Sequence, residues 1–74
     1  MEKDDEQLII SLLERDAELK RYYDEHLDLE RQISTFQQKG YLSPDEELQK
    51  RRLQKLKLAG KDRIMEILAR YRGH

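Results

Sequence analysis

The feature that most limits how this chain can fold is a regular run of residues between Asp16 and Gly40. Six residues recur there at spacings of 3, 4, 3, 4 and 3, which places them on one face of an α-helix. The pattern predicts a helix over about residues 17–39 that packs against a second helix. The inward-facing residues are Leu19, Tyr22, His26, Leu29, Ile33 and Phe36.

A second helix is predicted over about residues 44–71. Ser43 at the N-cap, Pro44 in the first turn and Glu46 three residues after the cap form a capping box, which marks a helix start. Inward-facing residues then recur at spacings of 3, 4, 4, 3 and 4. They are Leu53, Leu56, Gly60, Ile64, Ile67 and Tyr71.

The short loop over residues 40–43 forces these two helices to run antiparallel. We therefore expect residues 1–74 to form a single all-α domain, a coiled-coil-like helical hairpin whose two stripes form one seam. In this arrangement Tyr22 is expected opposite Gly60, where the missing side chain would let the ring approach the backbone.

A shorter amphipathic helix is predicted before the hairpin, over about residues 5–15. Asp16 can cap the following helix, which favours a break between the two. Ala17, Glu18 and Leu19 are good helix formers, which favours a continuous helix instead. The sequence leaves both arrangements open.

The chain holds more apolar residues than a two-helix hairpin covers. Those outside the seam predict a second interface, most simply in a homodimer that forms a four-helix bundle. A higher oligomer or a helix of an unknown partner protein would cover these apolar residues equally well. The candidate second interface consists of Leu8, Ile9, Leu12, Leu13, Leu58, Met65 and Leu68.

Composition narrows the function classes. The chain has 74 residues and no cysteine, which excludes disulfides and thiolate metal sites. Its two histidines, His26 and His74, are too separated for a structural zinc site. No apolar run is long enough to span a membrane, and the acidic N-terminus does not resemble a signal peptide. We expect a cytoplasmic protein without cofactor.

The motifs of both long helices resemble a known family. They read Leu19-x2-Tyr22-x3-His26-x2-Leu29-Glu30-x2-Ile33, and then Leu53-x3-Lys57-Leu58-x2-Lys61-Asp62-x2-Met65-x2-Leu68. This pattern is similar to that of the YdcH-like family of small bacterial proteins, from about Asp16 to Leu68. Glu30 stands where the family usually has aspartate, and Gly60 where it usually has leucine. The proline often seen near Ala17 is missing. The resemblance implies a helical hairpin of unknown function in the bacterial cytoplasm, and it supplies no catalytic residues.

His26 is the residue that could take part in the widest range of chemical functions. A histidine beside carboxylates can be a metal ligand, a general base or a pH switch. In a helix seam it can equally fix the alignment of the two helices, as polar seam residues do in coiled coils. We favour this second interpretation, in a candidate polar layer of His26, Glu30, Lys57 and Lys61.

Charge is unevenly distributed along the chain. Residues 1–40 hold six Lys or Arg and eleven Asp or Glu, whereas residues 41–74 hold nine and five. The basic second half suggests nucleic-acid binding through phosphate contacts as an alternative function. Its basic residues are spread around the helix, which favours a solvated surface. They are Lys50, Arg51, Arg52, Lys55, Lys57, Lys61 and Arg63.

No nucleophile elbow, phosphate loop or metal-protease motif occurs in the sequence, and a thin hairpin offers no enclosed pocket. We therefore predict a protein that is not an enzyme. The leading hypothesis is a small interaction module that binds itself or a partner helix. A nucleic-acid-associated accessory protein is the alternative, and a metal- or pH-responsive regulator centred on His26 is a third.

Overall fold

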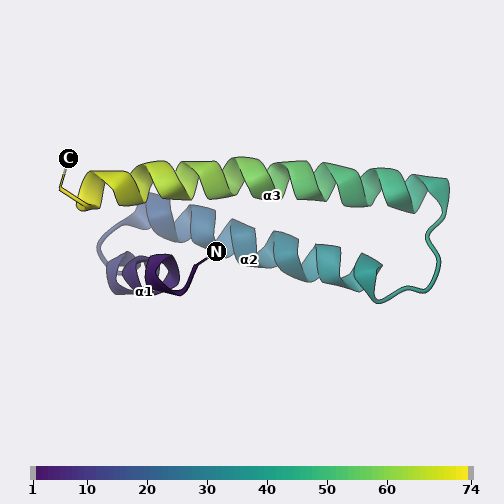
Figure 1. Ribbon diagram of the computed structural model, residues 1–74, viewed down its shortest axis with the longest axis horizontal. Helices are drawn as coiled ribbons and strands as arrows, with labels where there is room; N and C mark the ends of the chain where they lie inside the picture. The colour runs from purple at the N-terminus through teal and green to yellow at the C-terminus, as the bar shows by residue number, and fades with distance from the viewer. Residues whose placement is uncertain (1, 74) are drawn as a thin grey trace.

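The computed structural model describes residues 2–73, which form three α-helices and no strand (Figure 1). The helices are α1 (Lys3–Leu12), α2 (Ala17–Gln37) and α3 (Pro44–Tyr71). The all-α class predicted from the sequence is confirmed. The two long helices, α2 and α3, lie side by side and run in opposite directions, and α1 lies against the end where α2 begins (Figure 1).

Helices α1 and α2 are separate and are joined by a turn, so the first two helices are not continuous. Asp16 has an extended backbone (φ −127°, ψ 99°), and its Oδ1 accepts the Leu19 N–H at 2.9 Å. The N–H groups of Arg15 and Asp16 both donate to the Leu12 carbonyl, at 3.0 and 2.9 Å. These bonds close a turn, so α1 ends at Leu12 instead of residue 15. The cap at Asp16 therefore outweighs the helix propensity of the residues after it.

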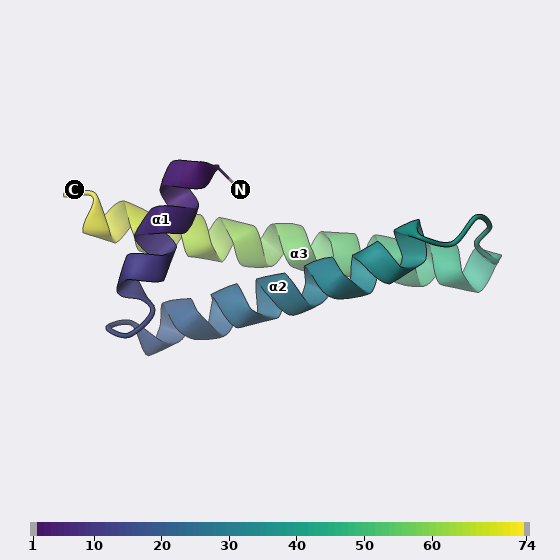
Figure 2. The ribbon, with the colours of Figure 1, turned by 90° about the horizontal axis from the view of Figure 1, so that it is seen from below.

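The core lies where all three helices meet. Helix α1 crosses the α2–α3 pair at the end that holds the start of α2 and the last turns of α3 (Figure 2). It inserts Ile9 between the two long helices, and Ile9 is fully buried. The other buried members of this cluster are Leu12, Leu19, Ile64, Ile67 and Leu68.

This core corrects the predicted second interface. Ile9, Leu12 and Leu68 are buried within one chain, because α1 folds back onto the flank that they were expected to offer to another molecule. Three further residues, Leu8, Leu13 and Met65, are partly buried against the same cluster. Of the seven residues, Leu58 is the exposed one, at 60%.

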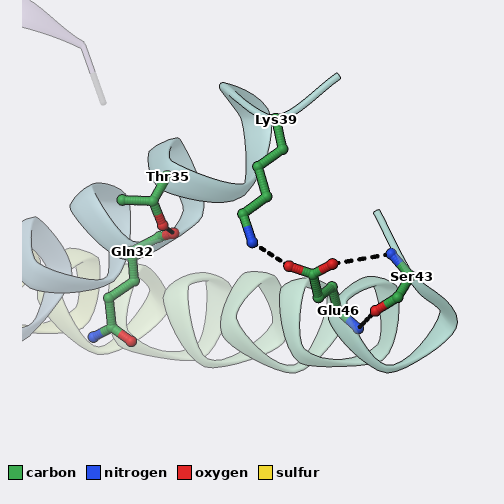
Figure 3. Close-up of polar contacts among 5 residues, drawn as sticks. All are labelled: Gln32, Thr35, Lys39, Ser43 and Glu46. Carbon is green, nitrogen blue, oxygen red and sulfur yellow. Dashed lines mark hydrogen bonds and ion pairs between the residues drawn. The ribbon is translucent and has the colours of Figure 1, made fainter. Parts of the chain in front are cut away.

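The connection between α2 and α3 is held by its own polar contacts (Figure 3). Helix α2 ends at Gln37, two residues before the predicted end. Ser43 Oγ accepts the Glu46 N–H at 3.2 Å, and the Ser43 N–H donates to Glu46 Oε1 at 3.1 Å. The Lys39 ammonium donates to the other Glu46 oxygen. The capping box thus starts α3 and also ties it to the end of α2.

Neighbouring isoleucines in α1 test how strongly this helix is docked. Ile9→Ala is expected to lower the free energy of unfolding by about 2–5 kcal/mol, because it leaves a cavity in the core. Ile10→Ala serves as the matched control, since Ile10 is 60% exposed, and it should change stability by about 0.5 kcal/mol or less. Urea unfolding followed by circular dichroism measures both. Equal effects of the two substitutions would contradict the docked position of α1.

The contact between Lys39 and Glu46 makes a prediction about pH. The Lys39 ammonium first, and then the hydrogen bonds from Ser43, lower the pKa of Glu46 from its usual 4.5 to about 2. A carboxylate with a lowered folded pKa contributes stability above its unfolded pKa, and this contribution is lost as the pH falls through the folded value.

We therefore expect Lys39→Gln to move the Glu46 titration, followed by NMR, up toward 4.5. The same substitution should destabilise the protein at neutral pH and have little effect near pH 2. A Glu46 titration that does not respond to Lys39→Gln would contradict the pairing.

Candidate functional site

The structure brings most of the predicted seam together between α2 and α3. On α2, Leu19, His26 and Ile33 are buried, and the other three are half-buried. On α3, Ile64 and Ile67 are buried. The half-buried members of the seam are Tyr22, Leu29, Phe36, Leu53 and Gly60.

Two seam predictions on α3 were wrong. Leu56 is 58% exposed, and Lys57 takes the inward position after Leu53. Spacings of 3 and 4 are both compatible with a helix face, so the sequence pattern alone did not separate these neighbours. Tyr71 is also exposed, and its hydroxyl donates to Asp16 Oδ2 at 2.6 Å. This bond raises the pKa of Tyr71 and lowers that of Asp16.

The predicted polar layer is present in part. His26 is only 4% exposed, and its Nε2 lies 2.7 Å from Glu30 Oε1. Lys57 Nζ lies 3.9 Å from the same oxygen. Lys61 is half-buried but makes no ion pair with residues 2–73. His26 and Glu30 both lie on α2, and Lys57 joins this pair to α3, so the predicted role of the layer in helix alignment stays a prediction.

His26 itself offers no open coordination site. Its Nδ1 is buried and has no hydrogen-bond partner within the described chain. A buried unpaired nitrogen costs about 1–3 kcal/mol. Residues 2–73 contain no group of three or more metal-ligating side chains. His26 is thus a buried residue whose Nε2 contacts Glu30.

An open groove runs between α2 and α3, and all of its lining residues belong to these two helices. It has a volume of about 410 Å³. Its apolar floor includes Leu29, Leu56 and Ala59, and Tyr22 stands at one end. The predicted contact of Tyr22 with Gly60 was wrong, because a side-chain carbon built on Gly60 would have no atom within 4 Å. Gly60 instead leaves a hollow in the groove.

Two smaller hollows extend the same flank in both directions. One is lined by Glu18, Tyr22, Arg63, Glu66, Ile67 and Arg70. The other is lined by Gln32, Phe36, Gln49, Arg52 and Leu53. The first of them shares Tyr22 and Arg63 with the central groove. We call the three hollows together the α2–α3 groove.

The rims of the α2–α3 groove carry opposite charge. The α2 rim holds three carboxylates, namely Glu18, Glu25 and Asp28. The α3 rim holds three arginines and one carboxylate, namely Arg52, Arg63, Glu66 and Arg70. The groove is therefore acidic along one edge and basic along the other.

Some of these charges are already engaged within the chain. Arg70 Nη1 lies 3.9 Å from Glu18 Oε1, across the groove. Arg63 Nη1 lies 3.1 Å from Glu66 Oε2, and the Tyr22 hydroxyl, followed by Glu66, raises the pKa of Arg63. Glu25 and Arg52 make no ion pair with any of residues 2–73. The groove thus keeps charge of both signs available to a ligand.

Sequence reasoning missed the rim of this groove. Glu25, Asp28 and Ala59 were not among the predicted site residues, and Arg63 was considered only as a possible phosphate contact. The signal that could have found them is the position of Leu56 beside Ala59 and Gly60, since two small residues next to a leucine leave a helix face hollow. No helix within residues 2–73 has both the length and the apolar character needed to cross a membrane.

Comparison with known proteins identifies the family. Residues 19–68 match the family described as "Protein of unknown function (DUF465)". The chain belongs to this family. The match agrees with the YdcH-like resemblance, and it covers most of α2 and α3 but none of α1. No curated protein and no solved structure matches the chain.

The hollow at Gly60 can be tested by filling it. Gly60→Ala is expected to raise the free energy of unfolding by about 0.5–1 kcal/mol, because alanine favours the helix and its methyl group meets nothing. Ala59→Gly, one residue away and exposed, is the reverse control and should lower stability by a similar amount. Thermal unfolding at low protein concentration measures both. A lower free energy of unfolding in Gly60→Ala would contradict the empty space at Gly60.

Proposed function

We propose that this protein is a small, non-enzymatic interaction module of the cytoplasm, which binds an amphipathic helix in the α2–α3 groove. The observation that carries the proposal is the exposure of Leu56, at 58%, in the middle of an apolar floor between two charged rims. A helix-binding groove has this composition, with apolar anchors in the centre and polar contacts at the edge.

The shape of the groove supports a helix as the ligand. It follows the two long helices over several turns, from the level of Glu18 to that of Phe36. It is open along its length, so it suits an extended helical surface better than a small molecule, which enclosed pockets bury almost completely. Both a second copy of the chain and a helix of another protein fit this description.

The position of helix α1 also supports a helix as the ligand. Helix α1 covers the opposite side of the core with Ile9 and Leu12. Where α1 crosses the α2–α3 pair, one flank is thus already packed against a helix of the same chain, whereas no helix of residues 2–73 packs in the groove. A helix bound there would complete a four-helix arrangement.

Two exposed leucines in α3 provide a matched test of the groove. Leu56 and Leu58 are 58% and 60% exposed, but only Leu56 lines the groove. Leu56→Glu is expected to weaken helix binding by more than about tenfold, because it places a charge on the apolar floor. Leu58→Glu should leave binding unchanged. Both variants should keep the thermal unfolding midpoint within a few degrees, since both sites are exposed.

Binding by the otherwise unmodified chain is mapped with a photoreactive amino acid at position 56 or position 58 in producing cells. Leu56→Glu and Leu58→Glu are compared with the photoreactive amino acid at position 59, which also lines the groove. The cross-linked peptides are then identified by mass spectrometry. Products at position 56 that map to one helical segment, with none at position 58, are the expected result. No product at position 56, or equal products at both positions, would refute the proposed function.

A further inference from the structure

We propose that the helix-binding groove is occupied by a second copy of the chain, related by a twofold axis that runs along the groove. This inference rests on the proposed function and names the ligand. A second copy brings its own apolar floor and its own pair of charged rims, so the same surface can serve as both site and ligand.

Charge complementarity selects how the two copies lie. Two copies can face each other with the twofold axis along the groove or across it. An axis across the groove would put the α2 rim against itself and the α3 rim against itself, so that carboxylates meet carboxylates and arginines meet arginines. An axis along the groove puts the acidic α2 rim of each copy on the basic α3 rim of the other. The second arrangement alone brings opposite charges together.

Contacts within the chain show which charges would meet. Glu18 contacts Arg70, and Glu30 contacts Lys57, so these two pairs mark equal levels along α2 and α3. Interpolating between them places Glu25 level with Arg63. A twofold axis along the groove preserves these levels, and Glu25 of each copy therefore faces Arg63 of the other. Glu25 has no ion pair within residues 2–73, so it is available for this contact. Arg63 contacts Glu66 through Nη1, and its guanidinium has further N–H donors for Glu25 of the other copy.

The floor of the groove fits the same arrangement. Within one chain, α2 and α3 run in opposite directions (Figure 1). A twofold axis along the groove therefore places α2 of the second copy over α3 of the first, antiparallel to it. Leu29 of the second copy then lies above the turn between Leu56 and Gly60. The empty space at Gly60 gives that leucine a hole to enter, as a knob enters a hole between packed helices.

Reversal of one charge pair tests both the dimer and its geometry. Glu25→Lys and Arg63→Glu are expected to weaken dimerisation by about tenfold each, because each places like charges together twice in the dimer. The double variant Glu25→Lys/Arg63→Glu restores opposite charges and should dimerise as the unmodified chain does. Sedimentation equilibrium at low and high salt measures association, and circular dichroism checks that each variant keeps its helices.

Mixing decides between the two arrangements. The double variant and the unmodified chain should form separate dimers when mixed, and native mass spectrometry distinguishes them by mass. Mixed dimers in preference to separate ones would indicate an axis across the groove and would overturn the inference. An unmodified chain that stays monomeric at all concentrations would overturn it as well.

The monomeric outcome also separates this inference from the proposed function. If a monomeric chain still cross-links from position 56 to a helix of another protein, the proposal that a second copy occupies the groove is wrong. The proposal that the groove binds a helix then stands. If a monomeric chain gives no such product, both are wrong. A dimer that dissociates with Leu56→Glu but not with Leu58→Glu supports both.

Discussion

The packing of α1 across the α2–α3 pair is the interaction on which the rest of the structure depends. Two long helices joined by a short loop share a narrow contact, and a chain of this size seldom gains much stability from one such contact. Ile9 and Leu12 widen the contact into a three-helix core with Leu19 and Ile64. The same packing decides which flank of the helix pair is closed and which stays open.

The polar contacts divide into two kinds according to what they fix. The turn at Asp16 and the capping box at Ser43 end one helix and begin the next, so they set where the chain changes direction. The ion pair of Lys57 on α3 with Glu30 on α2 lies between helices, and His26 contacts the same carboxylate from within α2. Sliding α3 along α2 by one turn would separate Lys57 from Glu30, whereas the His26–Glu30 contact lies within α2 and would remain.

Local signals in the sequence were enough to predict the helices and much of the seam. Ser43, Pro44 and Glu46 defined the start of α3, and the 3–4 spacing found His26 and Ile33. The sequence did not predict where α1 would dock, because an amphipathic helix packs as well on its own chain as on another. Nor did it separate Leu56 from Lys57, since a lysine can lie along an interface with its alkyl stem while its ammonium reaches a carboxylate. Because Leu56 was expected in the seam, its place in the lining of the groove was not predicted.

The short connection between α1 and α2 has a consequence for competition between ligands. Only Leu13 to Asp16 separate the two helices, so α1 is tethered beside the flank that it covers. A segment held by so short a link acts as a ligand at an effective concentration on the order of millimolar or above. To displace α1, a free helix would need a concentration above this value or an affinity for the flank far higher than that of α1. The tether therefore directs incoming helices away from the covered flank without any contact that repels them.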